Sequence, residues 1–531
     1  MMLLLISFIL LAIGAAGLGK SAAVWATKRL PPGPPTIPFL GNVHQLPRRG
    51  IHFSYFDWAK KYGGLFSLKI GSLGDSIIVI SNDKIGTTLL DKRAAITSDR
   101  PETYALGRLA FRNNHLLFMR SDQRLRLRRK LIAQMVTESR CDADHIPLIE
   151  AEATQFLRDI CQYPEHMMEH APRYSNSIVM ALAFHSRTPR HDTRHMLDLE
   201  HLNNGFLELA EIGATPPVDW LPFLKYVPER LFGNWKSRSL RLRDDLLRLY
   251  APLRQKAQAR RDAVGATPSI YDAIRDQQDK LNMTDEEIDF LLGNVLEGGT
   301  DTVATTTLVF FQAMINFPAV CNAAQDQVDQ AFGDTAIPRW HDLEKIPIVT
   351  QIVKECLRWR PPVPASVPHS MAKDEEYEGL HLKKGSTILL NIWGIHHDPK
   401  RYPNPSQFDP SRFAKHLKSA SVYANANDGE NRDHFAYGSG RRICPGIHLA
   451  ERSLTTLFAK LLWGFSFAHK LDASGRPIPI DIRPETAYRD GFLNKVYPFE
   501  MVATPRSHRR REVMLEAADR EERDILSKYH V

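Results

Sequence analysis

The ten residues YGSGRRICPG, at positions 437–446, combine a cysteine with glycines, two arginines and a proline. By itself a buried cysteine is most often a small apolar side chain, but here Gly438 and Gly440 would let the backbone approach a flat object closely. Pro445 suits the first turn of the helix expected next, and a thiolate at a helix N-terminus has its pKa lowered by the helix dipole. The setting favours Cys444 as a single axial ligand of heme iron over zinc, which takes three or four ligands.

A second segment with chemical potential is LEGGTDTVATTT, residues 296–307. Thr284 and Glu287 predict a capping box, and apolar residues then continue to Pro318, so the segment lies inside a helix of about 30 residues. Each glycine costs about 1 kcal/mol relative to alanine in a helix interior. The two adjacent glycines therefore indicate a close approach to the helix backbone or a local opening of the helix, and a packed kink is the alternative.

The elements that must position these residues are mainly helical. Residues 141–161 and 237–261 have helical periodicity, residues 67–80 predict a strand pair turning at glycine, and residues 385–399 begin as a strand. Of the 531 residues, 43% are hydrophobic, which allows a large core. We therefore expect a mainly α fold with small β-sheets (α+β).

Composition and charge exclude several classes of protein. The cysteines number five, an odd and widely spread set, so a disulfide framework is improbable and a reducing compartment is expected. The net charge of +8 is small for this length and does not suggest a nucleic-acid partner. The last residues, 506–531, carry seven Lys/Arg and six Asp/Glu, and we expect this charged C-terminal tail to form a solvated helix.

The N-terminal residues 1–27 predict a transmembrane anchor, because the first 19 residues carry no charge and the apolar character resumes after Lys20. A cleaved signal peptide is the alternative, but the basic region that precedes its apolar run is missing. Lys28 and Arg29 follow the anchor, so the positive-inside rule places the following chain in the cytosol. Residues 28–38 are a stiff, proline-rich connector.

From this connector to Val502, the sequence resembles the cytochrome P450 family. The heme-binding loop of that family reads Phe-x-x-Gly-x-Arg-x-Cys-x-Gly. The corresponding residues here are Tyr437, Gly440, Arg442, Cys444 and Gly446. The resemblance implies a cytochrome P450 fold with a heme-thiolate catalytic domain over residues 39–505, heme b (iron protoporphyrin IX) bound through Cys444, and O2 as co-substrate.

In the same family, a long helix with a Gly-x-(Asp/Glu)-Thr segment crosses the oxygen-binding face of the heme. By this resemblance, Gly298 and Gly299 would leave room for dioxygen. Thr302, bonded back to the carbonyl four residues earlier, would hold a water molecule or the distal oxygen atom. Asp301 would relay the protons needed to cleave the O–O bond.

The resemblance also assigns two groups of charges. Behind the heme, a buried network with a structural role would consist of Glu355, Arg358 and Arg412. The cations for the heme propionates would be Arg442, His369 and Arg126. The family has Trp-Arg-x-x-Arg around the last of these, and Leu125 stands at the tryptophan position here. That departure leaves three neighbours as alternatives: Arg124, Arg128 and Arg129.

The implied function is a heme-thiolate monooxygenase, since thiolate donation to iron favours O–O cleavage. The chain has no nicotinamide or flavin fingerprint and no length for a fused reductase. NADPH-cytochrome P450 reductase is therefore expected as the partner, with cytochrome b5 as a second candidate, at the endoplasmic reticulum membrane. The basic residues between positions 124 and 130 would dock an acidic partner.

The segments that line the substrate pocket in the family are largely apolar here, which indicates a small lipophilic substrate. They correspond to residues 104–118, 203–227, 294–298, 365–367 and 491–493. Residues 215–229 resemble fungal secondary-metabolism members, including hydroxylases of aromatic polyketides, or could instead dip into the membrane surface. Two alternatives stay open: an isomerase or dehydratase that works without a reductase, and a non-catalytic heme protein.

Overall fold

A computed structural model describes residues 29–38, 40–47, 49–70, 76–211, 213–426, 428–489 and 491–529. The predicted anchor, residues 1–27, lies outside the described residues. Within the described part of the chain, no single helix has the length and apolar character to cross a membrane. One pair, α13 (Asp285–Asn316) and α14 (Pro318–Phe332), meets that test together, by length and composition only, with a bend of 103° at the break.

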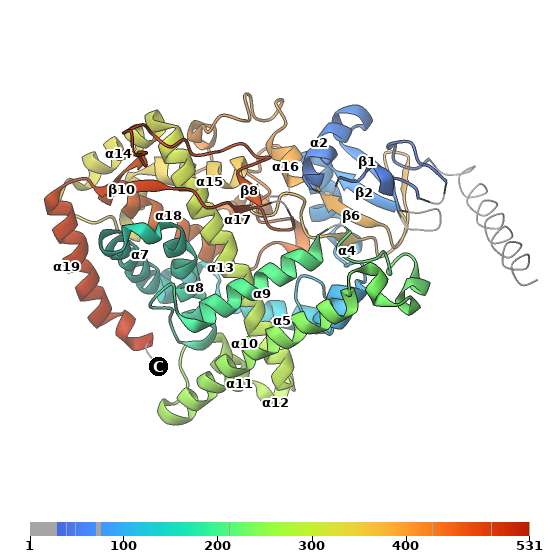
Figure 1. Cartoon of the computed structure of the whole chain (residues 1–531), viewed down its shortest axis with the longest axis horizontal. Helices are drawn as coiled ribbons and strands as arrows, with labels where there is room; N and C mark the ends of the chain where they lie inside the picture. Colours follow the sequence, from blue (N-terminus) through green and yellow to red (C-terminus); the bar gives the residue numbers. More distant parts are fainter. Residues whose placement is uncertain are drawn as a thin grey trace, which may run out of the picture.

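Helix α13 runs through the middle of the molecule (Figure 1). It begins at the predicted capping box, in which Thr284 Oγ1 accepts the Glu287 N–H (3.2 Å) and a Glu287 carboxylate oxygen accepts the Thr284 N–H (3.0 Å). It ends where Pro318 begins α14, because proline lacks the N–H that would continue the helix. The prediction of a long capped helix is confirmed.

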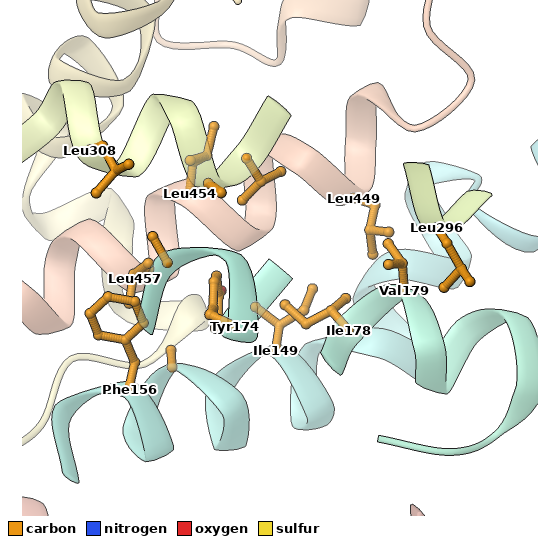
Figure 2. Packing of buried hydrophobic residues seen from close by; sticks show 14 of the residues in the cluster. Ile149, Phe156, Tyr174, Ile178, Val179, Leu296, Leu308, Leu449, Leu454 and Leu457 are labelled. Atoms are coloured by element: carbon orange, nitrogen blue, oxygen red, sulfur yellow. The ribbon is translucent and has the colours of Figure 1, made fainter. Parts of the chain in front are cut away.

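The core is built by α13 with three other helices: α7 (Ile146–Gln162), α8 (Met167–Phe184) and α18 (Ile447–Gly464). Helices α8 and α18 pack on α13, and α7 packs on α8 and α18. Figure 2 shows this packing, with Ile149 of α7, Val179 of α8, Leu296 of α13 and Leu454 of α18 pointing into one apolar layer. All four side chains are buried. Burial on this scale fixes α13 and α18 relative to each other, and these two helices carry the residues of chemical interest.

Four short sheets complete the fold. The largest has the order β1-β2-β6-β3, with β2 and β6 parallel and the other neighbours antiparallel. Its strands are β1 (Leu65–Lys69), β2 (Ser76–Ile80), β6 (Thr387–Leu390) and β3 (His369–Ser370). The predicted strand pair and the later strand are therefore confirmed, although residues 71–75 of the turn lie outside the described residues. The proline-rich connector packs on β1, where the Ser67 N–H donates to the Pro32 carbonyl (2.7 Å).

The other strands form three antiparallel pairs: β7 (Phe465–His469) with β10 (Met501–Pro505), β4 (Glu375–Tyr377) with β5 (Leu380–Leu382), and β8 (Tyr488–Arg489) with β9 (Lys495–Val496). The remaining helices are α2 (Ile51–Tyr62), α3 (Asp83–Gly86), α4 (Ala94–Thr97), α5 (Gln123–Met135), α6 (Glu138–Arg140), α9 (Arg194–Ala210), α10 (Trp235–Val264), α11 (Ile270–Arg275), α12 (Gln278–Leu281), α15 (Pro347–Trp359), α16 (Ile392–His396), α17 (Ala420–Asn425) and α19 (His508–Asp524). A mainly α fold with small sheets is what the sequence predicted.

The C-terminal helix α19 corrects one expectation. It lies along α7 (Figure 1), and Met514, Ala517 and Ala518 are buried in that contact. These residues have the i, i+3, i+4 spacing of a helix with one apolar face. Arg510 adds charged hydrogen bonds to Asp329 (2.9 Å) and Asp334 (2.9 Å). The predicted helix is present, but the expectation of a solvated helix is wrong for this buried face.

Candidate active site

The loop that carries Cys444 ends where α18 begins. Gly440 has a φ of 61°, and a Cβ at this position would overlap the carbonyl oxygen of Leu90, so only glycine fits. The Gly440 N–H donates to Asp91 Oδ1 (2.6 Å) and the Cys444 N–H donates to the Tyr437 carbonyl (2.8 Å). The close approach at Gly440 is therefore to the protein's own backbone, and not to a flat ligand as the sequence indicated.

At Gly438 the surroundings differ. Its φ is 78°, and a Cβ there would meet no atom within 4 Å. This glycine has open space beside it and is compatible with a flat group. Gly446 has ordinary φ, and a Cβ there would lie 3.9 Å from Cys444 Sγ, in normal van der Waals contact.

The pKa of Cys444 departs from the expectation. Burial raises the pKa of the thiol, while the Gly446 N–H and the charge of Arg129 oppose that rise. For the protein by itself the balance is a raised pKa of Cys444, opposite in direction to the lowering expected at a helix N-terminus. A coordinating thiol is deprotonated by the charge of the metal it binds, so the half-buried Cys444 sulfur is compatible with a metal ligand.

Three arginines gather on one side of this loop without a carboxylate partner among the described residues. Arg442 donates to the Ser98 carbonyl (2.9 Å) and the Met119 carbonyl (2.7 Å), and Arg129 donates to the Ile443 carbonyl (2.6 Å). The third, Arg100, donates to the carbonyls of Val367 (2.8 Å) and Pro368 (2.6 Å), and its buried Nε has no partner.

These positive charges repel one another. Burial and then Arg129 lower the pKa of Arg442 to about 10, and burial and then Arg442 lower the pKa of Arg100. His369 joins the group, with its Nδ1 donating to the Thr97 carbonyl (2.8 Å). Burial, followed by Arg100 and Arg442, pushes the pKa of His369 well below its usual value. A buried cluster of this kind requires anionic partners, and the two propionates of heme would supply them, so the residues present fit that cofactor.

The structure does not bring Arg126 to this cluster. Its side chain is exposed on α5, and within the described part of the chain no side-chain contact links it to Arg442. Of the alternatives considered, Arg124 and Arg128 both bind Glu287 (2.7 and 2.6 Å), which leaves Arg129 as the residue of this helix that reaches the loop. Sequence reasoning missed Arg100 altogether, because it stands outside the motifs that were recognised.

In helix α13, a threonine side chain bonds back to the helix backbone near the paired glycines. Thr302 Oγ1 donates to the Gly298 carbonyl four residues earlier (2.8 Å), as predicted. A Cβ on Gly298 would meet no atom within 4 Å, so this glycine faces open space. A Cβ on Gly299 would overlap the Val179 side chain of α8. Gly299 thus serves helix packing, and the expectation that both glycines leave room for dioxygen holds for the geometry of Gly298 only.

Asp301 is held by two residues that the sequence did not single out as its partners. Its Oδ2 accepts a hydrogen bond from Asn203 Nδ2 of α9 (2.9 Å) and lies 2.7 Å from Lys495 Nζ of β9. The carboxylate therefore connects α13 to two distant segments of the chain. Any proton transfer by Asp301 starts from this paired arrangement.

The structure places the three charges of the predicted network together. Arg358 donates to both oxygens of Glu355 (2.7 and 2.6 Å), and Arg412 Nε lies 3.5 Å from Glu355 Oε1. Glu355 and Arg358 have no exposed surface. Burial raises the pKa of Glu355, although Arg358 opposes the rise. The bidentate geometry and the burial agree with a structural role.

Four of the five segments expected to line a pocket also meet. The Phe206 ring lies 5.6 Å from the Phe111 ring and 5.9 Å from the Phe492 ring, and His115 Nε2 lies 2.8 Å from Glu297. The fifth segment, residues 365–367, does not share these ring contacts, and Ala365 packs instead with the apolar cluster at β1 and β2. Aromatic rings from three separate segments therefore lie close to α13.

Comparison with known proteins gives one consistent result. A family model described as cytochrome P450 matches residues 31–499. The chain is 52% identical to the cytochrome P450 monooxygenase anuE of Penicillium roqueforti, over 90% of this chain and 96% of that one. It is 42% identical to the cytochrome P450 monooxygenase macC of Penicillium terrestre, over 94% of each. Among solved structures, a zebrafish cytochrome P450 with abiraterone has a TM-score of 0.67 at 20% identity, covering 86% of this chain and all of that one, which shows the shared fold.

Proposed function

The chain belongs to the cytochrome P450 family and is a monooxygenase of that family, and on this premise we propose that it uses heme b, held by Cys444, to insert one oxygen atom of O2 into a small aromatic substrate. The observation that carries the proposal is a group of three arginines beside the Cys444 loop that has no carboxylate partner among the described residues. Arg100 and Arg442 are buried and Arg129 is half-buried. When bound, heme with a thiolate ligand supplies the reductive activation of O2 that oxidises C–H bonds.

The residues of the chain divide the remaining work. Cys444 would hold the iron, the three arginines would neutralise the propionates, and His369 would help to orient them. Gly298 leaves space beside α13 for small molecules. Two groups can hold and move protons at this place. Thr302 Oγ1 is bonded to the Gly298 carbonyl, and Asp301 is paired with Lys495.

We further propose a phenolic polyketide of secondary metabolism as the substrate. The contacts among the rings of Phe111, Phe206 and Phe492 support an aromatic substrate, since a cluster of aromatic side chains favours contact with another ring. Electrons would come from NADPH through NADPH-cytochrome P450 reductase, with cytochrome b5 as a second donor. In the basic segment of α5, the exposed cations that such an acidic partner would meet are Arg124, Arg126 and Lys130.

The function is tested by incubating purified, heme-loaded protein with a panel of alkylphenols. Product heavier by one oxygen atom is expected only when both NADPH and the reductase are present. Omission of the reductase is the matched control. Conversion of an oxygenated substrate without NADPH and reductase would instead support the isomerase or dehydratase alternative. Absence of any conversion across phenols, with conversion of another lipophilic class, would reject the phenolic assignment.

The location proposed is the endoplasmic reticulum membrane, with a single span at residues 1–27 and the catalytic domain facing the cytosol. A second contact with the membrane is supported by exposed apolar side chains on one segment, Phe223 (62% exposed), Tyr226 (89%) and Leu231 (67%). Large exposed apolar patches of this kind mark membrane or protein contacts.

Removal of residues 1–28 is expected to shift most of the protein from the membrane pellet to the supernatant after cell fractionation. A remainder should stay bound through the exposed segment and be released by low concentrations of detergent. Immunoblotting of the two fractions gives the measurement. Secretion of the full-length protein with a new N-terminus near residue 17 would show that the apolar segment is a signal peptide.

A further inference from the structure

A buried carboxylate, Glu297, lies on α13 directly before the open space at Gly298. Its Oε2 accepts a hydrogen bond from His115 Nε2 (2.8 Å), and its Oε1 accepts one from the Tyr250 hydroxyl. The side chains of Glu297 and His115 are 9% and 3% exposed. No lysine or arginine pairs with Glu297 within the described part of the chain. The carboxylate is thus held in place by hydrogen bonds alone.

Both hydrogen-bond partners of Glu297 are donors. His115 Nδ1 accepts the Leu117 N–H (3.2 Å), so the ring proton is on Nε2, which faces the carboxylate. Burial and the charge of Glu297 keep the pKa of Tyr250 well above its usual value, so its hydroxyl stays a donor. Gly293 makes this arrangement possible, because a Cβ there would overlap the Tyr250 ring. Each carboxylate oxygen can accept a second hydrogen bond.

The surroundings of this carboxylate are aromatic. The His115 ring lies 4.4 Å from the ring of Phe111, 5.4 Å from that of Phe118 and 6.0 Å from that of Phe206. Phe206 in turn contacts Phe492. An ionised group among phenylalanine rings is costly unless polar partners satisfy it. The position therefore calls for a ligand with an apolar ring and a hydrogen-bond donor.

An independent observation one turn earlier on α13 specifies that ligand more closely. Asn294 is 9% exposed, and its Oδ1 accepts the Leu116 N–H (2.7 Å), which fixes the orientation of the amide. Its buried Nδ2 has no partner. Residues three apart on a helix are neighbours, so the free donor of Asn294 and the acceptor of Glu297 lie on the same stretch of α13. A buried donor without a partner costs free energy unless a ligand satisfies it.

We propose that Glu297 and Asn294 together bind the phenolic hydroxyl of the substrate, and the proposal rests on the function given above. The hydroxyl donates to the Glu297 carboxylate and accepts from Asn294 Nδ2, while the rings of Phe111, Phe118, Phe206 and Phe492 receive the aromatic ring. A hydroxyl both donates and accepts, which matches the pair. An ammonium group only donates and a methyl ether only accepts, so each leaves one of the two residues without a partner.

The test compares three probes with the same para-butyl ring, para-butylphenol, para-butylanisole and para-butylbenzylamine, by calorimetric titration of the heme-loaded, full-length protein. The wild type should bind the phenol about 10- to 100-fold more tightly than the ether, as expected for a hydrogen bond to a charged group. Glu297→Gln should reduce that difference to about threefold or less, because a neutral amide oxygen accepts more weakly. Glu286→Gln, a more exposed position on the same helix, should leave it unchanged.

A second variant separates the two residues. Asn294→Asp keeps an oxygen for the Leu116 N–H but replaces the donor with an acceptor, so it should weaken phenol binding and strengthen binding of the amine. A phenol preference that survives in Glu297→Gln would overturn the role of Glu297 while leaving the proposed function intact. A wild type that does not distinguish phenol from ether would reject the phenolic substrate itself. Tightest binding of the amine by the wild type would overturn the hydroxyl assignment.

Discussion

Replacing Cys444 with alanine is expected to remove all monooxygenase activity and most of the bound heme from a protein that still folds. Burial raises the pKa of the other four cysteines, Cys141, Cys161, Cys321 and Cys356, and none of them stands in the loop before α18. The loop itself should persist, since it is built by the Cys444 N–H bond to Tyr437 and by Gly440 against Leu90, neither of which uses the sulfur.

Heme content per protein after gel filtration and product formation give the measurement, with circular dichroism as the check on folding. Cys161→Ala is the matched control, because it removes a partly buried thiol elsewhere in the chain. Product formation by Cys444→Ala at wild-type heme content would contradict the assignment of this residue.

Replacing Asp301 with asparagine is expected to lower the turnover rate about 10²- to 10⁴-fold, the range in which proton donors contribute. Asparagine keeps the size of the side chain and can still contact Asn203 and Lys495, but it cannot titrate.

In Thr302→Ala, product formation should fall more than NADPH consumption, with hydrogen peroxide making up the difference, because electrons still arrive while proton delivery is impaired. Peroxide formed per NADPH at equal heme content is the measurement for both variants.

The structure supplies a control for the Thr302 variant. Thr306 Oγ1 donates to the Thr302 carbonyl (2.9 Å), the same type of bond one turn further along α13. Thr306 is buried, whereas Thr302 is partly accessible. A helix-bending role predicts loss of folded, heme-loaded protein in both variants with unchanged coupling in what survives. A proton-delivery role predicts excess peroxide in Thr302→Ala only.

Local patterns in the sequence were sufficient for much of the fold. The capping box at Thr284 and the stop at Pro318 defined α13, since both depend on neighbours a few residues away. The loop around Cys444 was equally readable, because its glycines, proline and following helix are contiguous. The spacing of Met514, Ala517 and Ala518 also indicates a buried face on α19. The many charged residues of this segment favoured the prediction of a solvated helix instead.

The sequence did not predict contacts between residues that lie far apart in the chain. The prediction that position 440 needs a glycine is consistent with the structure. The reason is a carbonyl oxygen of Leu90, about 350 residues earlier in the chain, which a Cβ at this position would overlap. Gly299 likewise faces Val179 of α8. The third cation near the Cys444 loop is Arg129 rather than Arg126, because the register of one helix face decides which side chain points inward. No local pattern joins Arg100 or Lys495 to the site, since their partners come from other parts of the chain.

The central claim is that Cys444 supplies a thiolate to heme iron, and the absorption spectrum of the reduced carbon-monoxide complex tests it most directly. The wild type and Cys161→Ala are expected to show the red-shifted band that a thiolate ligand gives, and Cys444→Ala is expected to lack it even when heme is still bound. A thiolate-type band that persists in Cys444→Ala, or that is missing from folded, heme-loaded wild type, would contradict the claim.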